Sequence, residues 1–157
     1  KLLSPTGIIQ SDKMILFFTW AIFVLAVQLN GIKTLDRLNG KIYLIMGNHD
    51  LKNIRQGYID KFGHVAMQTH IEVGKQKIYL NHYPFLCFDG GYKDVWQLFG
   101  HVHTRKNNTG IDAARLQYLY PTQYDVGVDN NNFMPVSFSI SFCKVSANSA
   151  KLSFAIT

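Results

Sequence analysis

The chain has 157 residues, of which 47% are hydrophobic and 17% are charged. This composition suits one compact domain and excludes a disordered, collagen-like or coiled-coil chain. The formal charge of +6 favours an anionic partner, such as a phosphate group, a nucleic acid or a membrane surface. Cys87 and Cys143 stand in no zinc-type spacing and imply no disulfide scaffold, so we expect a reducing compartment and a cytoplasmic protein. The first residue is Lys1 and not Met, which is compatible with a fragment.

The first notable element is a hydrophobic segment at residues 14–29, which follows Lys13. Its length of about 16 residues is below the ~20 that a helix needs to span a bilayer. No clear small-residue cleavage site of the kind found in signal peptides accompanies it. A membrane anchor and a buried helix of the fold are both open interpretations. We expect membrane association only if this segment is a genuine anchor.

From residue 32 the sequence has the pattern of an α/β domain. Apolar residues at helical spacing predict a helix over residues 32–38, which Asn39-Gly40 then ends. A short apolar run bounded by glycines predicts a buried strand over residues 41–46. Residues 51–62 are predicted to form a further helix.

Strands dominate the predictions for the rest of the chain. Residues 66–73 and 75–80 alternate in polarity around Gly74, which predicts a hairpin. Residues 95–103 are predicted to be a strand that runs into a polar turn, and residues 125–129 a short strand.

Polar, metal-competent side chains follow three of these strands. They are Asn48, His49 and Asp50 after the first, His82 after the second, and His101 and His103 after the third. Taken singly, each group is explained by turn chemistry, helix capping or a structural histidine. Three such strand ends in one chain are harder to explain independently, because ligands of open α/β sheets bind at the carboxyl ends of strands. We interpret His64 and His70 as ordinary surface or loop residues.

A mixed set of imidazole and amide donors suits Mn, Fe, Zn or Ni better than Ca. The sequence therefore predicts a site for divalent metal ions at these strand ends.

The same residues resemble the motifs of the calcineurin-like metallophosphoesterases, in particular their small bacterial and phage members. The matching segments are Gly47-Asn48-His49-Asp50, His82 ahead of Tyr83-Pro84, and Gly100-His101-Val102-His103. Residues 125–129 with Met134-Pro135 resemble the family as well, so that the similarity covers residues 32–138. It implies a single domain with the four-layer α/β/β/α sandwich of that family, its N-terminal strands missing or altered.

The resemblance also implies a role for each matching residue. Asn48, His82 and His101 would ligate one metal ion and His103 the other. His49 would protonate the leaving oxygen or stabilise its charge, and Asp50 would orient His49. The implied reaction is two-metal hydrolysis of a phosphomonoester or phosphodiester, in which the ions polarise the phosphoryl group and activate water.

Two further motifs of the family are missing here. Its Asp-x-His and Gly-Asp motifs supply the remaining ligands and the bridging carboxylate, but the sequence before residue 36 contains no acidic residue except Asp12. We therefore divide the chain into an aberrant segment (1–31), a family-like part (32–138) and a divergent tail (139–157). A frameshift over the first segment is one hypothesis, since the alternative frame forces aspartate at the Met14/Ile15 junction and glycine at Trp20/Ala21.

The sequence thus predicts a metal-dependent phosphoester hydrolase, a metallophosphoesterase whose metal site is incomplete in this chain. Its expected substrate is a phosphorylated small molecule or a nucleotide. The alternatives are a catalytically inactive binding protein of the same family and a membrane-anchored protein using residues 14–29. The basic residues are scattered, so we expect no specific nucleic-acid site.

Overall fold

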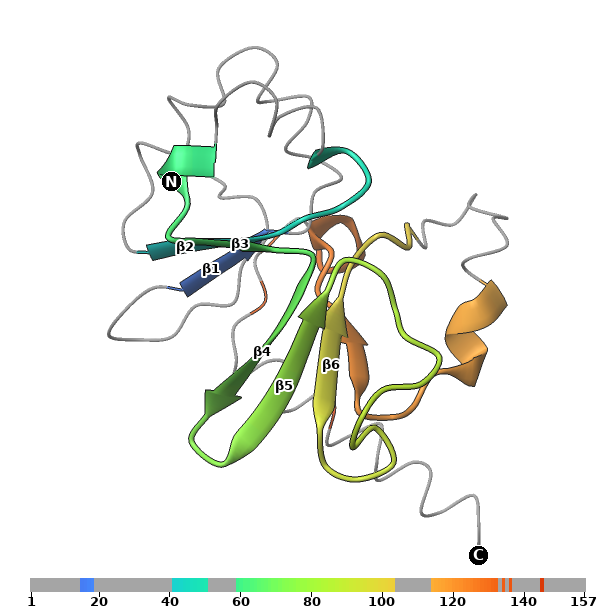
Figure 1. Ribbon diagram of the computed structural model, residues 1–157. Helices are drawn as coiled ribbons and strands as arrows, with labels where there is room; N and C mark the ends of the chain where they lie inside the picture. Colours follow the sequence, from blue (N-terminus) through green and yellow to red (C-terminus); the bar gives the residue numbers. More distant parts are fainter. Residues whose placement is uncertain are drawn as a thin grey trace, which may run out of the picture.

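The computed structural model describes residues 15–18, 41–50, 59–103, 114–132, 134, 136 and 145. These residues form two sheets that meet at their ends (Figure 1). The predicted helix over residues 32–38 lies outside the described residues, as does most of the one over residues 51–62.

Sheet A is a parallel three-stranded sheet in the order β1-β2-β3. It consists of β1 (Ile15–Phe18), β2 (Lys41–Ile45) and β3 (His64–Ala66). The apolar run of β2 makes it the central strand, which confirms the strand predicted there. Because Ile15–Phe18 pairs with β2, these four residues of the hydrophobic segment are a strand and not part of a helix.

Sheet B is a mixed four-stranded sheet in the order β4-β5-β6-β7. Its strands are β4 (Gln68–Val73), β5 (Gln76–Asn81), β6 (Trp96–Phe99) and β7 (Gln123–Asp125). The predicted hairpin is confirmed, since β4 and β5 pair antiparallel. Gly74 in their turn has a φ of +63°, which glycine adopts without strain. The other pairs are parallel.

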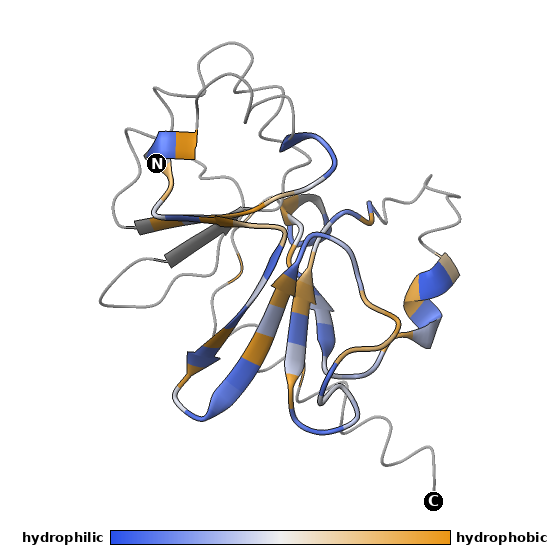
Figure 2. Cartoon of the chain, viewed as in Figure 1, coloured by the Kyte–Doolittle hydropathy of each residue, from blue (hydrophilic) through white to orange (hydrophobic). Residues whose placement is uncertain are grey.

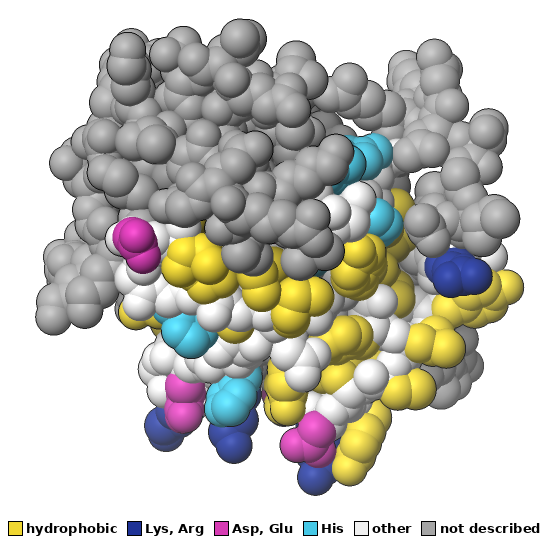
Figure 3. All heavy atoms as spheres, turned by 45° about the horizontal axis from the view of Figure 1, so that its top comes forward, with side chains coloured by type: hydrophobic (Ala, Val, Ile, Leu, Met, Phe, Trp, Pro, Cys, Tyr) yellow, Lys and Arg dark blue, Asp and Glu magenta, His cyan; other side chains and the backbone are white. Residues whose placement is uncertain are grey.

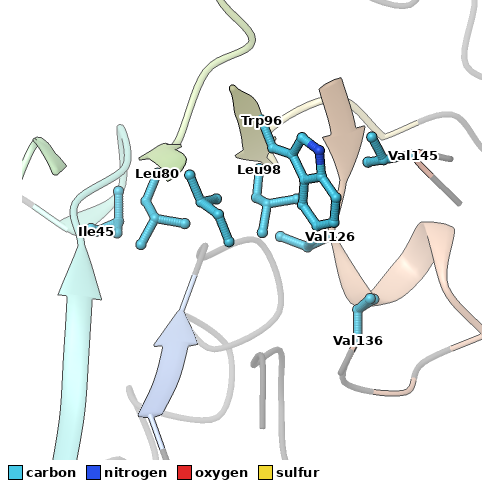
Figure 4. Packing of buried hydrophobic residues seen from close by; sticks show 8 residues of the cluster. Ile45, Leu80, Trp96, Leu98, Val126, Val136 and Val145 are labelled. Carbon is cyan, nitrogen blue, oxygen red and sulfur yellow. The ribbon is translucent and has the colours of Figure 1, made fainter. Parts of the chain in front are cut away.

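The hydrophobic core joins the two sheets. Ile78 and Leu80 of β5 point into it at every second position, and Figure 2 shows the alternation of hydrophobic and hydrophilic residues along this strand. Figure 4 shows Ile45 of sheet A beside Leu80, with Trp96 and Leu98 of β6 next in the row. The core therefore fixes the end of β2 against the ends of β5 and β6.

The four-layer α/β/β/α sandwich that we expected is wrong. The described part of the chain is rich in sheet and contains no complete α-helix, only short 3₁₀ turns: η1 (Ile59–Lys61), η2 (Leu116–Tyr118) and η3 (Val128–Asn130). Without complete helices, nothing described can build the outer layers of such a sandwich. Only Met67 separates β3 from β4, so the chain passes from one sheet to the other without a helix.

Two smaller expectations are also settled. The strand predicted over residues 125–129 ends at Asp125, because its Oδ1 atom accepts a hydrogen bond from the Gly127 backbone at 2.7 Å and turns the chain. No helix among the described residues is both long and apolar enough to cross a bilayer.

Candidate metal centre

The central side chains of the site lie just after the ends of three strands. Asn48 follows β2, His82 directly follows β5, and His101 follows β6. In Figure 1, the arrowheads of β5 and β6 point toward the loop that leaves β2. Residues far apart in sequence are thereby brought to one place.

His82 lies at the centre of this arrangement. Its Nε2 atom lies 2.8 Å from Asn48 Oδ1 and 3.1 Å from His101 Nδ1. A neutral imidazole carries one proton. When that proton is on Nδ1, Nε2 presents a lone pair beside those of Asn48 Oδ1 and His101 Nδ1. Three donor atoms that converge in this way are what a metal ion requires.

The spacing of these atoms also fits a metal ion. Two ligands at right angles, each about 2.0–2.2 Å from a common ion, are roughly 2.8–3.1 Å apart. Within the described residues, no three His, Cys, Asp or Glu side chains form a metal-binding group. The converging set is instead two imidazoles and one amide, which is a minimal ligand set with room for water or substrate.

Burial keeps His82 in the form that binds metals. Its side chain is 2% exposed, and burial lowers its pKa from 6.5 to about 4, assisted by the positive charges of His101, His49 and His103. The ring is therefore neutral at physiological pH, as metal ligation demands. Of the three other histidines, His101 is in direct contact with His82.

The ring of His82 is oriented by packing rather than by its second nitrogen. Nδ1 is buried without a hydrogen-bond partner among the described residues. A Cβ atom added at Gly47 would lie 2.6–2.8 Å from three atoms of the ring. The ring therefore rests on the bare backbone at Gly47, where only glycine leaves enough space.

His101 is held in a backbone conformation that side chains rarely adopt. Its φ is +67°, and the Val102 N–H donates to the Gly100 carbonyl at 2.7 Å, which closes a γ-turn around it. The Asn130 side chain donates both to the Val102 carbonyl at 2.6 Å and to Asp125 at 2.7 Å. The loop after β7 thus braces the turn that aims His101 at His82. Backbone strain of this kind is found mainly at functional sites.

Asp50 lies behind the site. Its carboxylate is 2% exposed and accepts a hydrogen bond from the Gly47 backbone, which closes the turn after β2. Burial raises the pKa of Asp50 from 3.8 to about 7, and the bond to Gly47 opposes this rise. This is the turn chemistry that we considered as the alternative to orienting His49, and the orienting role stays a prediction.

Sequence reasoning missed a pair of buried glutamines below the site. Gln97 Nε2 donates to the Tyr83 carbonyl at 3.0 Å, and Gln97 Oε1 accepts from the Phe85 backbone at 3.0 Å. Gln123 donates to Gln97 and, at 2.8 Å, to the Phe85 carbonyl. Together they fasten the segment after His82 onto sheet B. In the sequence, the sign of this role was that Gln97 is the single polar residue in the apolar strand of residues 96–99.

Comparisons with known proteins leave the family and the function open. No protein-family model and no curated protein matches the chain. A crystal structure of a protein of unknown function from Aquifex aeolicus is similar with a TM-score of 0.48 and 21% sequence identity. The match covers 76% of this chain and 70% of that one.

Proposed function

We propose that this chain binds a divalent metal ion at Asn48, His82 and His101 and acts in phosphoester hydrolysis. The observation that carries the proposal is the convergence of three donor atoms within 3.1 Å around His82 Nε2. The order of the motifs, which resembles that of the metallophosphoesterases, points to the same chemistry.

A divalent ion bound there would supply positive charge for the phosphoryl oxygens and for activation of water. His49 is exposed and directly follows Asn48 in the chain, and it would protonate a leaving oxygen. His103 follows His101 by two residues and would ligate a second ion. Substrates of this class are anionic, in line with the charge of +6.

The missing Gly-Asp and Asp-x-His motifs favour a second candidate, a binding protein for phosphorylated ligands without turnover. Without a bridging carboxylate, nothing in the sequence holds two cations together. A nucleic-acid surface has less support. Among the described side chains on the face shown in Figure 3, the basic ones along the lower edge lie among acidic ones and form no continuous patch.

Metal stoichiometry and turnover distinguish the two candidates. Calorimetric titration with Mn²⁺ and with Zn²⁺ should give at least one ion per chain, and bis(p-nitrophenyl) phosphate should be hydrolysed if the hydrolase proposal holds. His82→Ala should abolish both metal binding and turnover. His70→Ala is the matched control, since His70 is an exposed histidine on β4 and should change neither.

One bound ion without turnover would favour the binding protein. Failure of the wild-type chain to bind any divalent ion, or equal binding by His82→Ala, would overturn the metal centre itself.

A further inference from the structure

An apolar cleft of about 510 Å³ opens directly beside the candidate metal centre. This volume is within the range of roughly 300–1,000 Å³ that is typical of small-molecule sites. His101 belongs both to the metal centre and to the wall of the cleft. A phosphate bound at the centre would therefore have this cleft beside it.

The walls are mostly hydrophobic and partly aromatic. Tyr83 and Leu86 line it from the segment after β5, and Tyr118 lines it from η2. Leu86 and Tyr118 are each 68% exposed. Figure 3 shows histidine side chains bordering hydrophobic ones on one side of the molecule. Exposed apolar surface at the edge of a polar centre is typical of a ligand site.

The wall of the cleft that follows β5 is formed in advance. Gln97 and Gln123 hold the backbone of Tyr83 and Phe85 by three hydrogen bonds and are joined to each other by a fourth, so the wall after β5 is fixed to sheet B. A preformed wall lowers the ordering cost of binding. The position of Tyr83 is fixed further by its ring, which contacts His101 with centroids 4.5 Å apart.

Aromatic and basic groups together indicate what the cleft accepts. Tyr83 and Tyr118 both line the cleft, and aromatic rings pack favourably against planar groups. Arg115 adds a positive charge at the same cleft, which attracts an anionic ligand. A purely aliphatic, hydroxylated ester would gain little from such walls.

We infer that the cleft binds the planar aromatic group of a phosphoester, so that aryl phosphates and nucleoside phosphates are preferred over aliphatic ones. This inference rests on the proposed function, because the phosphate is taken to lie at the metal centre. The tyrosines select the ring, and Arg115 contributes to the attraction of the phosphate.

Binding, measured apart from turnover, tests the inference. Mn²⁺-loaded protein is titrated by calorimetry with phenyl phosphate and with glycerol 1-phosphate, and KM replaces the dissociation constant for a ligand that is hydrolysed during the titration. We expect Tyr118→Ala to weaken phenyl phosphate binding about tenfold and to leave glycerol phosphate binding unchanged, since an aromatic contact of this kind is lost. Tyr118→Phe should keep the preference. Tyr92→Ala is the matched control, because Tyr92 is 74% exposed and does not line the cleft.

Two further outcomes separate this inference from the proposed function. If His82→Ala abolishes binding of both phosphates while Tyr118→Ala leaves their affinity ratio unchanged, the metal centre stands and the aromatic site is refuted. If the ratio responds to Tyr118→Ala but neither ligand responds to Mn²⁺ or to His82→Ala, the cleft binds rings and the hydrolase proposal fails.

Discussion

Asn48 Oδ1 lies 2.8 Å from His82 Nε2, although the two residues are 34 positions apart in the chain. Asn48 follows sheet A and His82 follows sheet B, so this contact joins the two sheets at the candidate metal centre. An ion bound between them would add a further link and stabilise the folded state by mass action.

The side chain at position 48 should therefore control both the affinity for the metal ion and the stability of the fold, and its charge should matter most. Asn48→Asp replaces an amide oxygen by a carboxylate and should tighten Mn²⁺ binding on the order of tenfold, because ligand charge tunes the affinity for hard cations. Asn48→Leu removes the donor and should weaken binding. The melting temperature with and without Mn²⁺ measures both effects. Equal Mn²⁺-induced shifts in the two variants would contradict the assignment of Asn48 as a ligand.

Gly47→Ala should damage the site through a steric clash. The added methyl group would lie 2.6–2.8 Å from the ring of His82, which is buried and cannot swing away freely. Overpacking of this kind costs about 1–3 kcal/mol of unfolding free energy. Urea denaturation measures the loss, and calorimetry should show that Mn²⁺ binding is lost as well.

Gly74→Ala is the control for this variant. A Cβ atom at Gly74 would contact nothing within 4 Å, but its φ of +63° disfavours alanine. It should lower stability by about 1 kcal/mol through the backbone alone and leave metal binding intact. Metal binding that survives in Gly47→Ala would show that the ring of His82 tolerates the methyl group.

The γ-turn at His101 should reveal its strain through two substitutions that both remove the imidazole. His101→Gly can adopt a φ of +67° freely, whereas His101→Ala cannot. The glycine variant should be more stable than the alanine variant by about 1 kcal/mol, although neither binds the metal ion. Thermal unfolding in EDTA makes the comparison. Equal stability would mean that the turn relaxes in the alanine variant despite the hydrogen bond from Asn130 to the Val102 carbonyl.

Gln97→Leu should destabilise the fold although it makes β6 more hydrophobic. The variant leaves the Tyr83 carbonyl and the Phe85 N–H without Gln97, at a cost of about 1–3 kcal/mol for each buried polar group left unpaired. Gln76→Leu is the matched control, since its side chain also donates to backbone carbonyls but at an exposed position. It should change the urea midpoint little. A Gln97→Leu protein as stable as wild type would show that water replaces the lost bonds.

The parts of the fold predicted from sequence were those with strong local signals. The strand over residues 41–46 and the hairpin around Gly74 were indicated by short-range patterns that the tertiary structure kept. The short strand at residues 125–129 was only partly right, because the bond between Asp125 and Gly127 ends it. Propensity alone does not reveal such a bond.

The layers of the fold could not be predicted from such local patterns. They were expected from the resemblance of a few motifs, and motifs at strand ends constrain the loops more than the helices that cover a sheet. For the site, the spacing of polar residues after strands was enough to bring Asn48, His82 and His101 together. The requirement for glycine at position 47 and the support from Gln97 depend on contacts between distant segments, which no local pattern encodes.

The pH dependence of the metal-free protein should reflect two opposing groups near the site. The folded-state pKa of Asp50 is about 7 instead of 3.8, so its contribution to stability is complete below 3.8 and is lost as the pH rises toward 7. The folded-state pKa of His82 is about 4 instead of 6.5, so its contribution is present above 6.5 and is lost as the pH falls toward 4. Between pH 4 and 6.5, a rise in pH lowers the unfolding free energy through Asp50 and raises it through His82. These two slopes of stability against pH largely cancel.

Single substitutions should uncover each slope. In Asp50→Asn only the slope of His82 remains, and stability should rise with pH from 4 to 6.5 by about 1.4 kcal/mol per pH unit at most relative to wild type. In His82→Gln the slope of Asp50 remains, and stability should fall over the same window. Urea denaturation in EDTA at several pH values measures the differences, in which the titration of distant groups cancels. Parallel curves for all three proteins would contradict the assignment, because neither group would then exchange protons on unfolding.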